Sequence, residues 1–181
     1  MSKPNLKDAD GSDIFDGLWY KIMLSDGTEL GFGPLVNSRL SCGPKPPGQG
    51  MIFRYFRYKG NDTVSGYGWP SGDIGYFKGL GMGTDGKEYR QYLSLSNGVP
   101  PVLAWYDKDD SYGFTGTQIP GNRIALYAKD QTGATVGLRG ETESVSKEAV
   151  AFYGQRSQFP ICLDCSFVPI PVGNTDVGPF F

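Results

Sequence analysis

The sequence predicts an all-β protein made of short antiparallel strands, and three observations lead to this prediction. First, the chain of 181 residues contains 27 glycines and 13 prolines, and a glycine share about twice the average favours turns over long helices. Second, turn signals recur along the chain and separate short segments rich in Tyr, Phe, Ile and Val, as expected of strands joined by hairpins. Third, residues 88–95 alternate, with Tyr89 and Leu93 on one face and Arg90 and Ser94 on the other, which is typical of a half-exposed strand.

The first half of the chain provides an arm, a hairpin and a loop. Residues 1–17 show little pattern, and we expect them to form an N-terminal arm. Residues 18–24 run into a turn at Asp26 and continue as residues 29–36, so they predict a hairpin. Residues 43–50 are rich in glycine and proline, which indicates a loop.

The second half predicts two further hairpins and one short helix. One hairpin is expected to turn at Asp85, and another joins residues 124–129 to residues 135–139 through a turn at Thr132. Residues 143–153 place Val145, Ala149 and Phe152 at spacings of four and three, and Gly154 follows. This period predicts a helix that ends at a left-handed glycine.

We expect one all-β domain over residues 18–173, followed by a tail of residues 174–181. An antiparallel sandwich or a barrel would protect the strand edges, and we prefer a sandwich of two sheets. A β-trefoil is the alternative, because the turns at Asp26, Asp85 and Thr132 are 59 and 47 residues apart and hint at a threefold repeat. We expect at most one short helix, and this helix would leave the protein in the all-β class.

The absence of histidine from the whole sequence excludes many kinds of chemistry. Histidine is the usual general base near neutral pH and the commonest neutral metal ligand. Enzymes with a Ser-His-Asp or Cys-His arrangement, His-ligated haem and zinc sites with histidine are therefore impossible for this chain. We expect no cofactor and no metal site.

The charge balance disfavours binding of nucleic acids. The chain carries 17 Lys and Arg against 19 Asp and Glu, a formal net charge of −2, whereas nucleic-acid sites usually show a basic patch. The densest basic cluster is Arg54, Arg57 and Lys59, which alternates with four aromatic residues. Such a pattern can stack bases, but we interpret it as a half-buried strand with solvated arginines.

Cysteine usage and hydropathy place further limits on the chain. We expect Cys42, Cys162 and Cys165 to be small, largely buried thiols, and a pair between Cys162 and Cys165 remains the alternative. No apolar run approaches the length of a transmembrane helix. The N-terminus lacks an apolar signal region, so we expect a cytoplasmic protein or one released without a signal peptide.

Carboxylates are the remaining means of catalysis, and they define one alternative function. Paired carboxylates can hydrolyse glycosides without histidine, and the sequence offers Glu29, Glu88, Glu141 and Glu143. Sequence alone brings no two of them together. A carboxylate-based glycoside hydrolase therefore remains the second alternative, and we expect the protein not to be an enzyme.

The aromatic residues in segments with turn signals give the main functional hypothesis. Tyr67 and Trp69 belong to a Gly- and Pro-containing segment, Trp105 and Tyr106 are adjacent, and Tyr112 follows closely. Rings on loops, with short polar residues beside them, suit the faces and hydroxyl groups of sugars or lipid headgroups. We therefore expect a non-catalytic, lectin-like protein that binds a glycan or a lipid-headgroup surface through these five residues. The alternative for each tryptophan is burial in the core.

Two further observations concern partners. The chain resembles the small β-sandwich lipid-binding proteins of the aegerolysin and actinoporin kind at three places: Pro46-Pro47-Gly48, residues 71–76, and Trp105 with Tyr106. We transfer no residue role from that resemblance.

The same aromatic surface could instead be buried between copies of the chain. The first alternative function is therefore a structural subunit of a large assembly, such as a viral or phage coat or decoration protein, found in the virion.

Overall fold

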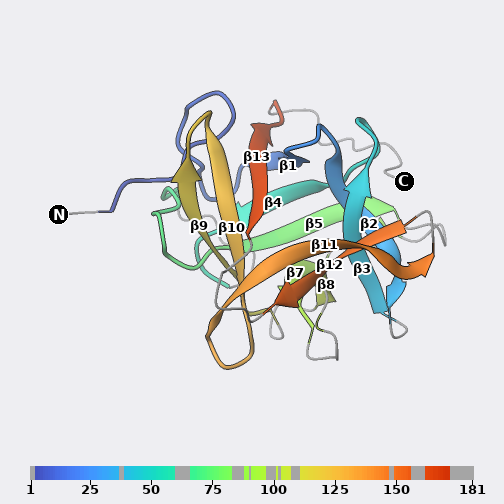
Figure 1. Cartoon of the computed structure of the whole chain (residues 1–181). Coiled ribbons are helices and arrows are strands. Elements are labelled where there is room, and N and C mark those ends of the chain that lie inside the picture. Colours follow the sequence, from blue (N-terminus) through green and yellow to red (C-terminus); the bar gives the residue numbers. More distant parts are fainter. Residues whose placement is uncertain are drawn as a thin grey trace.

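The protein is an all-β molecule in the computed structural model, as the sequence predicts (Figure 1). The structure describes residues 3–36, 39–59, 66–82, 88–89, 91–96, 101, 103–106, 111–146, 149–155 and 162–171. These ranges contain no helix, and therefore none that is long and apolar enough to cross a membrane. Their strands are β1 (Trp19–Leu24), β2 (Glu29–Val36), β3 (Arg39–Lys45), β4 (Ile52–Phe56), β5 (Tyr76–Met82), β6 (Glu88–Tyr89), β7 (Tyr92–Leu95), β8 (Leu103–Tyr106), β9 (Phe114–Ile119), β10 (Arg123–Lys129), β11 (Thr135–Ser146), β12 (Ala149–Gln155) and β13 (Leu163–Pro169).

Six strands close into an antiparallel barrel. β1 pairs with β4, β4 with β5, β9 with β10, β10 with β13, and β13 with β1. The last gap, between β5 and β9, is closed by Gly75 and Phe114, whose N–H groups donate to each other's carbonyl oxygens at 2.8 Å. A second closed ring of seven strands runs through β1, β2, β3, β8, β7, β5 and β4. The closed ladders leave the barrel strands without open edges.

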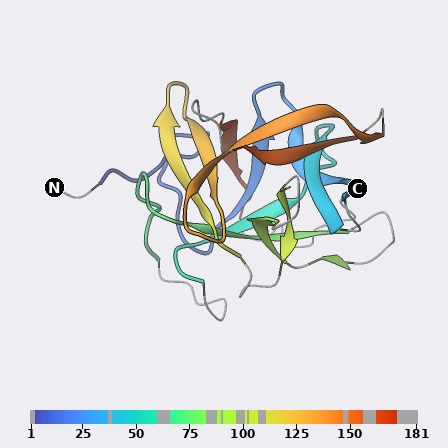
Figure 2. The same cartoon turned by 60° about the horizontal axis from the view of Figure 1, so that its bottom comes forward.

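Three hairpins outside the six-strand barrel lie against one another. They are β2–β3, β7–β8 and β11–β12. β3 pairs with β8 at Ser41 and Ala104, and β12 packs alongside β3 and β2 (Figure 2). Each third of the chain thus contributes two barrel strands with a hairpin between them. This is a β-trefoil arrangement, so our preference for a two-sheet sandwich was wrong and the threefold alternative is confirmed.

Equivalent turns in the first and third repeats share one local chemistry. The Asp26 carboxylate accepts a hydrogen bond from the Thr28 N–H at 3.0 Å, and Asp130 accepts one from the Thr132 N–H at 2.8 Å. Each turn also contains a glycine at positive φ. Such Asx turns satisfy backbone donors locally and tighten the chain reversal. The turn predicted at Asp85 lies outside the described residues.

The helix predicted over residues 143–153 is replaced by the end of β11 and by β12. Gly140 and Glu141 face Phe152 and Ala151 in an antiparallel ladder, with an irregularity before Ser146. Phe152 and Leu138 are buried. Pairing and burial of these side chains outweigh a weak helical period that covers only three apolar residues.

Aromatic rings fill the barrel, and the N-terminal segment packs against them. Trp69, from the connection between β4 and β5, stacks on Tyr55 with a ring-centroid distance of 5.3 Å and meets Phe77 and Phe167 edge-on. Leu6 is fully buried, and its N–H donates to the Trp69 carbonyl oxygen at 2.8 Å. Residues 3–17, expected to be an arm, are therefore packed on the barrel, whereas residues 174–181 lie outside the described residues.

Candidate functional site

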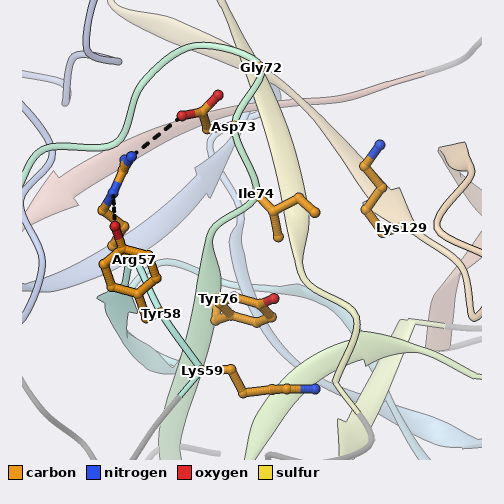
Figure 3. A pocket seen from close by; sticks show the side chains of 8 residues that line it. All are labelled: Arg57, Tyr58, Lys59, Gly72, Asp73, Ile74, Tyr76 and Lys129. Atoms are coloured by element: carbon orange, nitrogen blue, oxygen red, sulfur yellow. Dashed lines mark hydrogen bonds and ion pairs between the residues drawn. The ribbon is translucent and has the colours of Figure 1, made fainter.

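A hollow of about 650 Å³ opens where the connection between β4 and β5 meets the end of β10 (Figure 3). Residues 57–59 follow β4, residues 72–74 precede β5, and Tyr76 begins β5. Lys129 enters from the end of β10. We call this feature the β4–β5 hollow. Its volume lies within the usual range for small-ligand sites, about 300–1,000 Å³.

The core fixes the backbone beneath the hollow. The indole N–H of Trp69 donates to the Asp73 carbonyl oxygen at 2.9 Å. A Cβ atom added to Gly75 would lie 2.6 Å from the Tyr55 ring and 2.9 Å from the Trp69 indole nitrogen, so the close approach requires glycine. The floor of the hollow is therefore attached directly to buried rings.

An arginine and an aspartate form one side of the hollow. The Arg57 guanidinium lies 3.6 Å from the Asp73 carboxylate, and its Nε donates to the Tyr58 hydroxyl at 3.2 Å. The hydrogen bond with Tyr58 is the main cause of a raised pKa for Arg57, so the guanidinium stays charged. Asp73 also accepts a hydrogen bond from the Lys3 ammonium at 2.6 Å.

Two lysines supply the other positive charges. The Lys59 ammonium donates to the Ser111 carbonyl oxygen at 2.8 Å and lies 5.9 Å from the centroid of the Tyr76 ring. The Lys129 ammonium donates to the Thr135 hydroxyl at 2.7 Å. Burial raises the pKa of Tyr76, so its phenol stays neutral. The described lining therefore contains three cationic side chains and one carboxylate.

Exposed apolar residues gather beside the hollow. Tyr58 and Ile74 line it, and Tyr67 is 63% exposed next to Gly68, whose carbonyl oxygen accepts a hydrogen bond from Arg57 at 3.5 Å. Phe15 pairs with Gly68 and is also exposed. Exposed rings grouped around a concave site are typical of ligand or partner contacts.

The five predicted site residues differ in burial and do not form one surface. Trp69 and Trp105 are 0% and 3% exposed, so the expectation that they lie on exposed loops is corrected. Trp69 fills the barrel because its ring completes the aromatic core, and Trp105 packs on Phe53 and Phe32 with centroid distances of 5.8 Å. Their burial removes both rings from any surface of this conformation.

The three tyrosines have different positions. Tyr67 is exposed beside the Arg57 side of the hollow. Tyr112 is half-buried next to Ser111, the acceptor of the Lys59 hydrogen bond. The side chain of Tyr106 lies outside what the structure describes. Tyr67 and Tyr112 are therefore each next in sequence to a residue whose carbonyl oxygen binds a lining side chain, but neither lines the hollow itself.

Sequence reasoning missed most of the lining. Arg57, Tyr58 and Lys59 belong to the alternating basic and aromatic cluster, and this pattern was the available signal. Arg54 of the same cluster donates instead to the Gly17 carbonyl oxygen at 2.7 Å. Lys129 had no local signal, because only the pairing of β10 into the barrel brings it to the hollow.

The described residues gather no set of metal ligands, and of the four glutamates considered for catalysis they include one side chain, that of Glu29. No group of three or more Cys, Asp or Glu among them could hold a metal ion. Glu29 is buried, lies 3.0 Å from the Lys21 ammonium and accepts the Gly48 N–H at 2.6 Å, so it holds a loop in place. The side chains of Glu88, Glu141 and Glu143 are outside the described part of the chain.

The cysteines of the structure are free thiols. Cys42 and Cys165 are buried and Cys162 is partly exposed. Burial raises the pKa of the Cys42 thiol well above its ordinary value and raises that of Cys165 as well. Thiols with raised pKa values are poor nucleophiles at neutral pH.

Comparisons with known proteins identify the fold. No protein-family model matches the sequence, and no curated protein matches it. Among solved structures, the chain is similar to a soybean trypsin inhibitor (13% identity, TM-score 0.67, covering 92% of this chain and 100% of that one). It is also similar to winged bean albumin 1 (14%, 0.67, 92% and 99%) and to a water-soluble chlorophyll protein from Brassica oleracea var. Botrytis with chlorophyll-b (12%, 0.66, 92% and 99%). These likenesses show that the chain has the β-trefoil fold of Kunitz-type inhibitors.

Proposed function

We propose that this protein is a non-catalytic binding protein that recognises a glycan or a lipid-headgroup surface through the side chains around the β4–β5 hollow. The observation that carries the proposal is the exposure of Tyr58 and Ile74 in the lining of a concave site of about 650 Å³, with exposed Tyr67 next to Gly68, whose carbonyl oxygen binds Arg57 of the lining. Ring faces pack against the apolar face of a sugar, while hydroxyl, carboxylate and ammonium groups bind its hydroxyls.

The fold supports a binding role without selecting the ligand. Its structural neighbours include a water-soluble chlorophyll protein, trypsin inhibitors and a rice bifunctional α-amylase/subtilisin inhibitor. Their ligands share no chemistry, which is consistent with a rigid barrel whose loops carry the function. For this chain, the rings and charges of the hollow therefore have to identify the ligand class.

The test is a glycan array together with co-sedimentation of liposomes of varied headgroup. We expect binding by the wild type and its loss in Tyr58→Ala and Tyr67→Ala. Leu35→Ala is the control, because Leu35 is 61% exposed on β2 and does not line the hollow. Failure of the wild type to bind any glycan or liposome, with inhibition of trypsin instead, would show that the proposal is wrong.

A subunit of an assembly remains the second candidate, because the same exposed residues could pack against another copy. Phe15, Leu18, Tyr58, Tyr67 and Ile74 are each about 40% exposed or more. Light scattering over a range of concentrations measures the mass in solution against 19.7 kDa for one chain. A monomer at every concentration supports the binding proposal, and a large defined particle supports assembly.

A further inference from the structure

We infer that the β4–β5 hollow selects ligands that carry a sulfate or phosphate ester on a polyol. This inference rests on the proposed function and specifies the ligand of the same site. The shared chemistry is a multiply hydroxylated body with a strongly anionic group, as in a sulfated sugar or a phosphorylated inositol.

The hollow carries a local excess of positive charge. Arg57, Lys59 and Lys129 line the hollow, and Asp73 is the one carboxylate among the described lining residues. Asp73 also interacts with the Lys3 ammonium outside this set. The chain as a whole has a net charge of −2, so the positive hollow is a local feature and not a consequence of overall composition. A positive concave site raises the local concentration of anions.

The cationic donors of the hollow lie on separate sides of it. Figure 3 shows Arg57 and Asp73 on one side of Ile74 and Tyr76, with Lys129 on the other side. An ammonium has three N–H donors, and the Thr135 hydroxyl bound by Lys129 is neutral, so the charge of Lys129 remains. A sulfate or phosphate presents several acceptor oxygens to separated cations and forms charge-assisted hydrogen bonds.

The middle of the hollow suits the polyol body of such a ligand. The Tyr76 ring and Ile74 lie between the two charged sides (Figure 3) and offer an apolar contact for the carbon face of a sugar or an inositol ring. Asp73 accepts hydrogen bonds from the hydroxyl groups of a polyol, whereas it would repel a second anionic group. The site therefore suits an ester with free hydroxyls better than a simple polyanion.

The experiment is calorimetric titration of the full chain with two matched pairs of probes at low ionic strength. One pair is galactose 6-sulfate and galactose, and the other is myo-inositol 1-phosphate and myo-inositol, so that each anionic probe carries one ester and each partner is neutral. We expect each anionic probe to bind at least about tenfold more tightly than its neutral partner, or about 1.4 kcal/mol. Added salt should weaken the anionic binding, because it screens exposed charges.

Three lysine variants locate the effect. We expect Lys129→Gln and Lys59→Gln each to weaken binding of the anionic probes by about three- to tenfold, the range of a lost charge-assisted hydrogen bond at a partly exposed site. Lys45→Gln is the matched control, because Lys45 ends β3 and does not line the hollow. Equal losses in all three variants would overturn the inference, since they would indicate attraction by overall charge.

Further measurements distinguish a membrane ligand from a soluble one, and failure of this inference from failure of the proposed function. Phosphatidylcholine vesicles with and without a phosphoinositide show whether the ester acts on a membrane, while the free probes report soluble ligands. Equal binding of neutral and anionic probes, abolished by Tyr58→Ala, would overturn this inference and leave the proposed function standing. No binding of either kind would overturn both, and binding of an Asp/Glu-rich peptide without binding of the esters would overturn this inference in favour of a protein partner.

Discussion

Replacing Trp69 with alanine should mainly destabilise the protein, because the ring belongs to the core and not to a ligand surface. Trp69 is 0% exposed and contacts the rings of Tyr55, Phe77 and Phe167. Truncating a buried tryptophan to alanine costs about 3–5 kcal/mol. The lost hydrogen bond to the Asp73 carbonyl oxygen adds about 1 kcal/mol where water does not replace it.

The assay is urea unfolding followed by circular dichroism, so that the signal does not depend on the mutated tryptophan. A loss of about 4 kcal/mol is a large part of a typical stability of about 5–15 kcal/mol. For a chain of this size it lowers the Tm by roughly 8–16 °C. Tyr67→Ala is the control, because an exposed ring should change the free energy of unfolding by less than about 0.5 kcal/mol.

The same variant pair tests the reasoning about the site. If Trp69→Ala lowers the free energy of unfolding by less than about 1 kcal/mol and also abolishes ligand binding, the placement of Trp69 in the core is refuted. Trp69→Phe keeps most of the ring contacts and removes only the indole N–H. We expect Trp69→Phe to fold and to weaken ligand binding, because the Asp73 backbone at the floor of the hollow loses its anchor.

Three further predictions concern packing, pH and thiols. Gly79→Ala should lower the free energy of unfolding by about 1–3 kcal/mol, because the added Cβ atom would overlap the buried Trp105 ring. Urea unfolding measures this loss, and an unchanged urea midpoint would contradict the packing. Burial raises the pKa of Tyr20 from 10.0 to about 12, so its contribution to the free energy of unfolding is complete below pH 10 and is lost as the pH rises to about 12. A Tyr20→Phe variant should therefore lose less stability than the wild type between pH 10 and pH 12. An identical dependence of stability on pH in the two proteins would contradict this prediction. A thiol reagent should modify Cys162 first in the folded protein and all three thiols after unfolding, whereas a single reactive thiol after unfolding would indicate a disulfide.

The turn chemistry explains why the fold class could be predicted from sequence. The turns at Asp26 and Asp130 depend on hydrogen bonds between residues close in sequence, and each reverses the chain where a strand ends. The closure of the barrel could not be predicted in the same way, because it depends on contacts such as Gly75 with Phe114 that join distant segments. The misassigned helix at residues 143–153 has the same cause, since the pairing with β11 decides its conformation.

The candidate site shows a similar division between local and distant information. Tyr67 could be placed at an exposed turn from its neighbours, and the structure agrees. Trp69, two residues later, has the same local sequence context but faces the opposite way into the barrel, which only the tertiary fold determines. Arg57 and Lys129 line the same hollow because β10 joins the barrel, and no pattern near Lys129 indicates this.

The most direct test of the account is to map ligand contacts by amide chemical-shift changes in the isotope-labelled protein, with galactose 6-sulfate as the probe. The account predicts that the largest changes fall at Arg57, Tyr58, Asp73, Ile74 and Lys129, on three segments that only the fold brings together. Changes centred on the β2–β3 or β11–β12 hairpins, with none at these five residues, would contradict it.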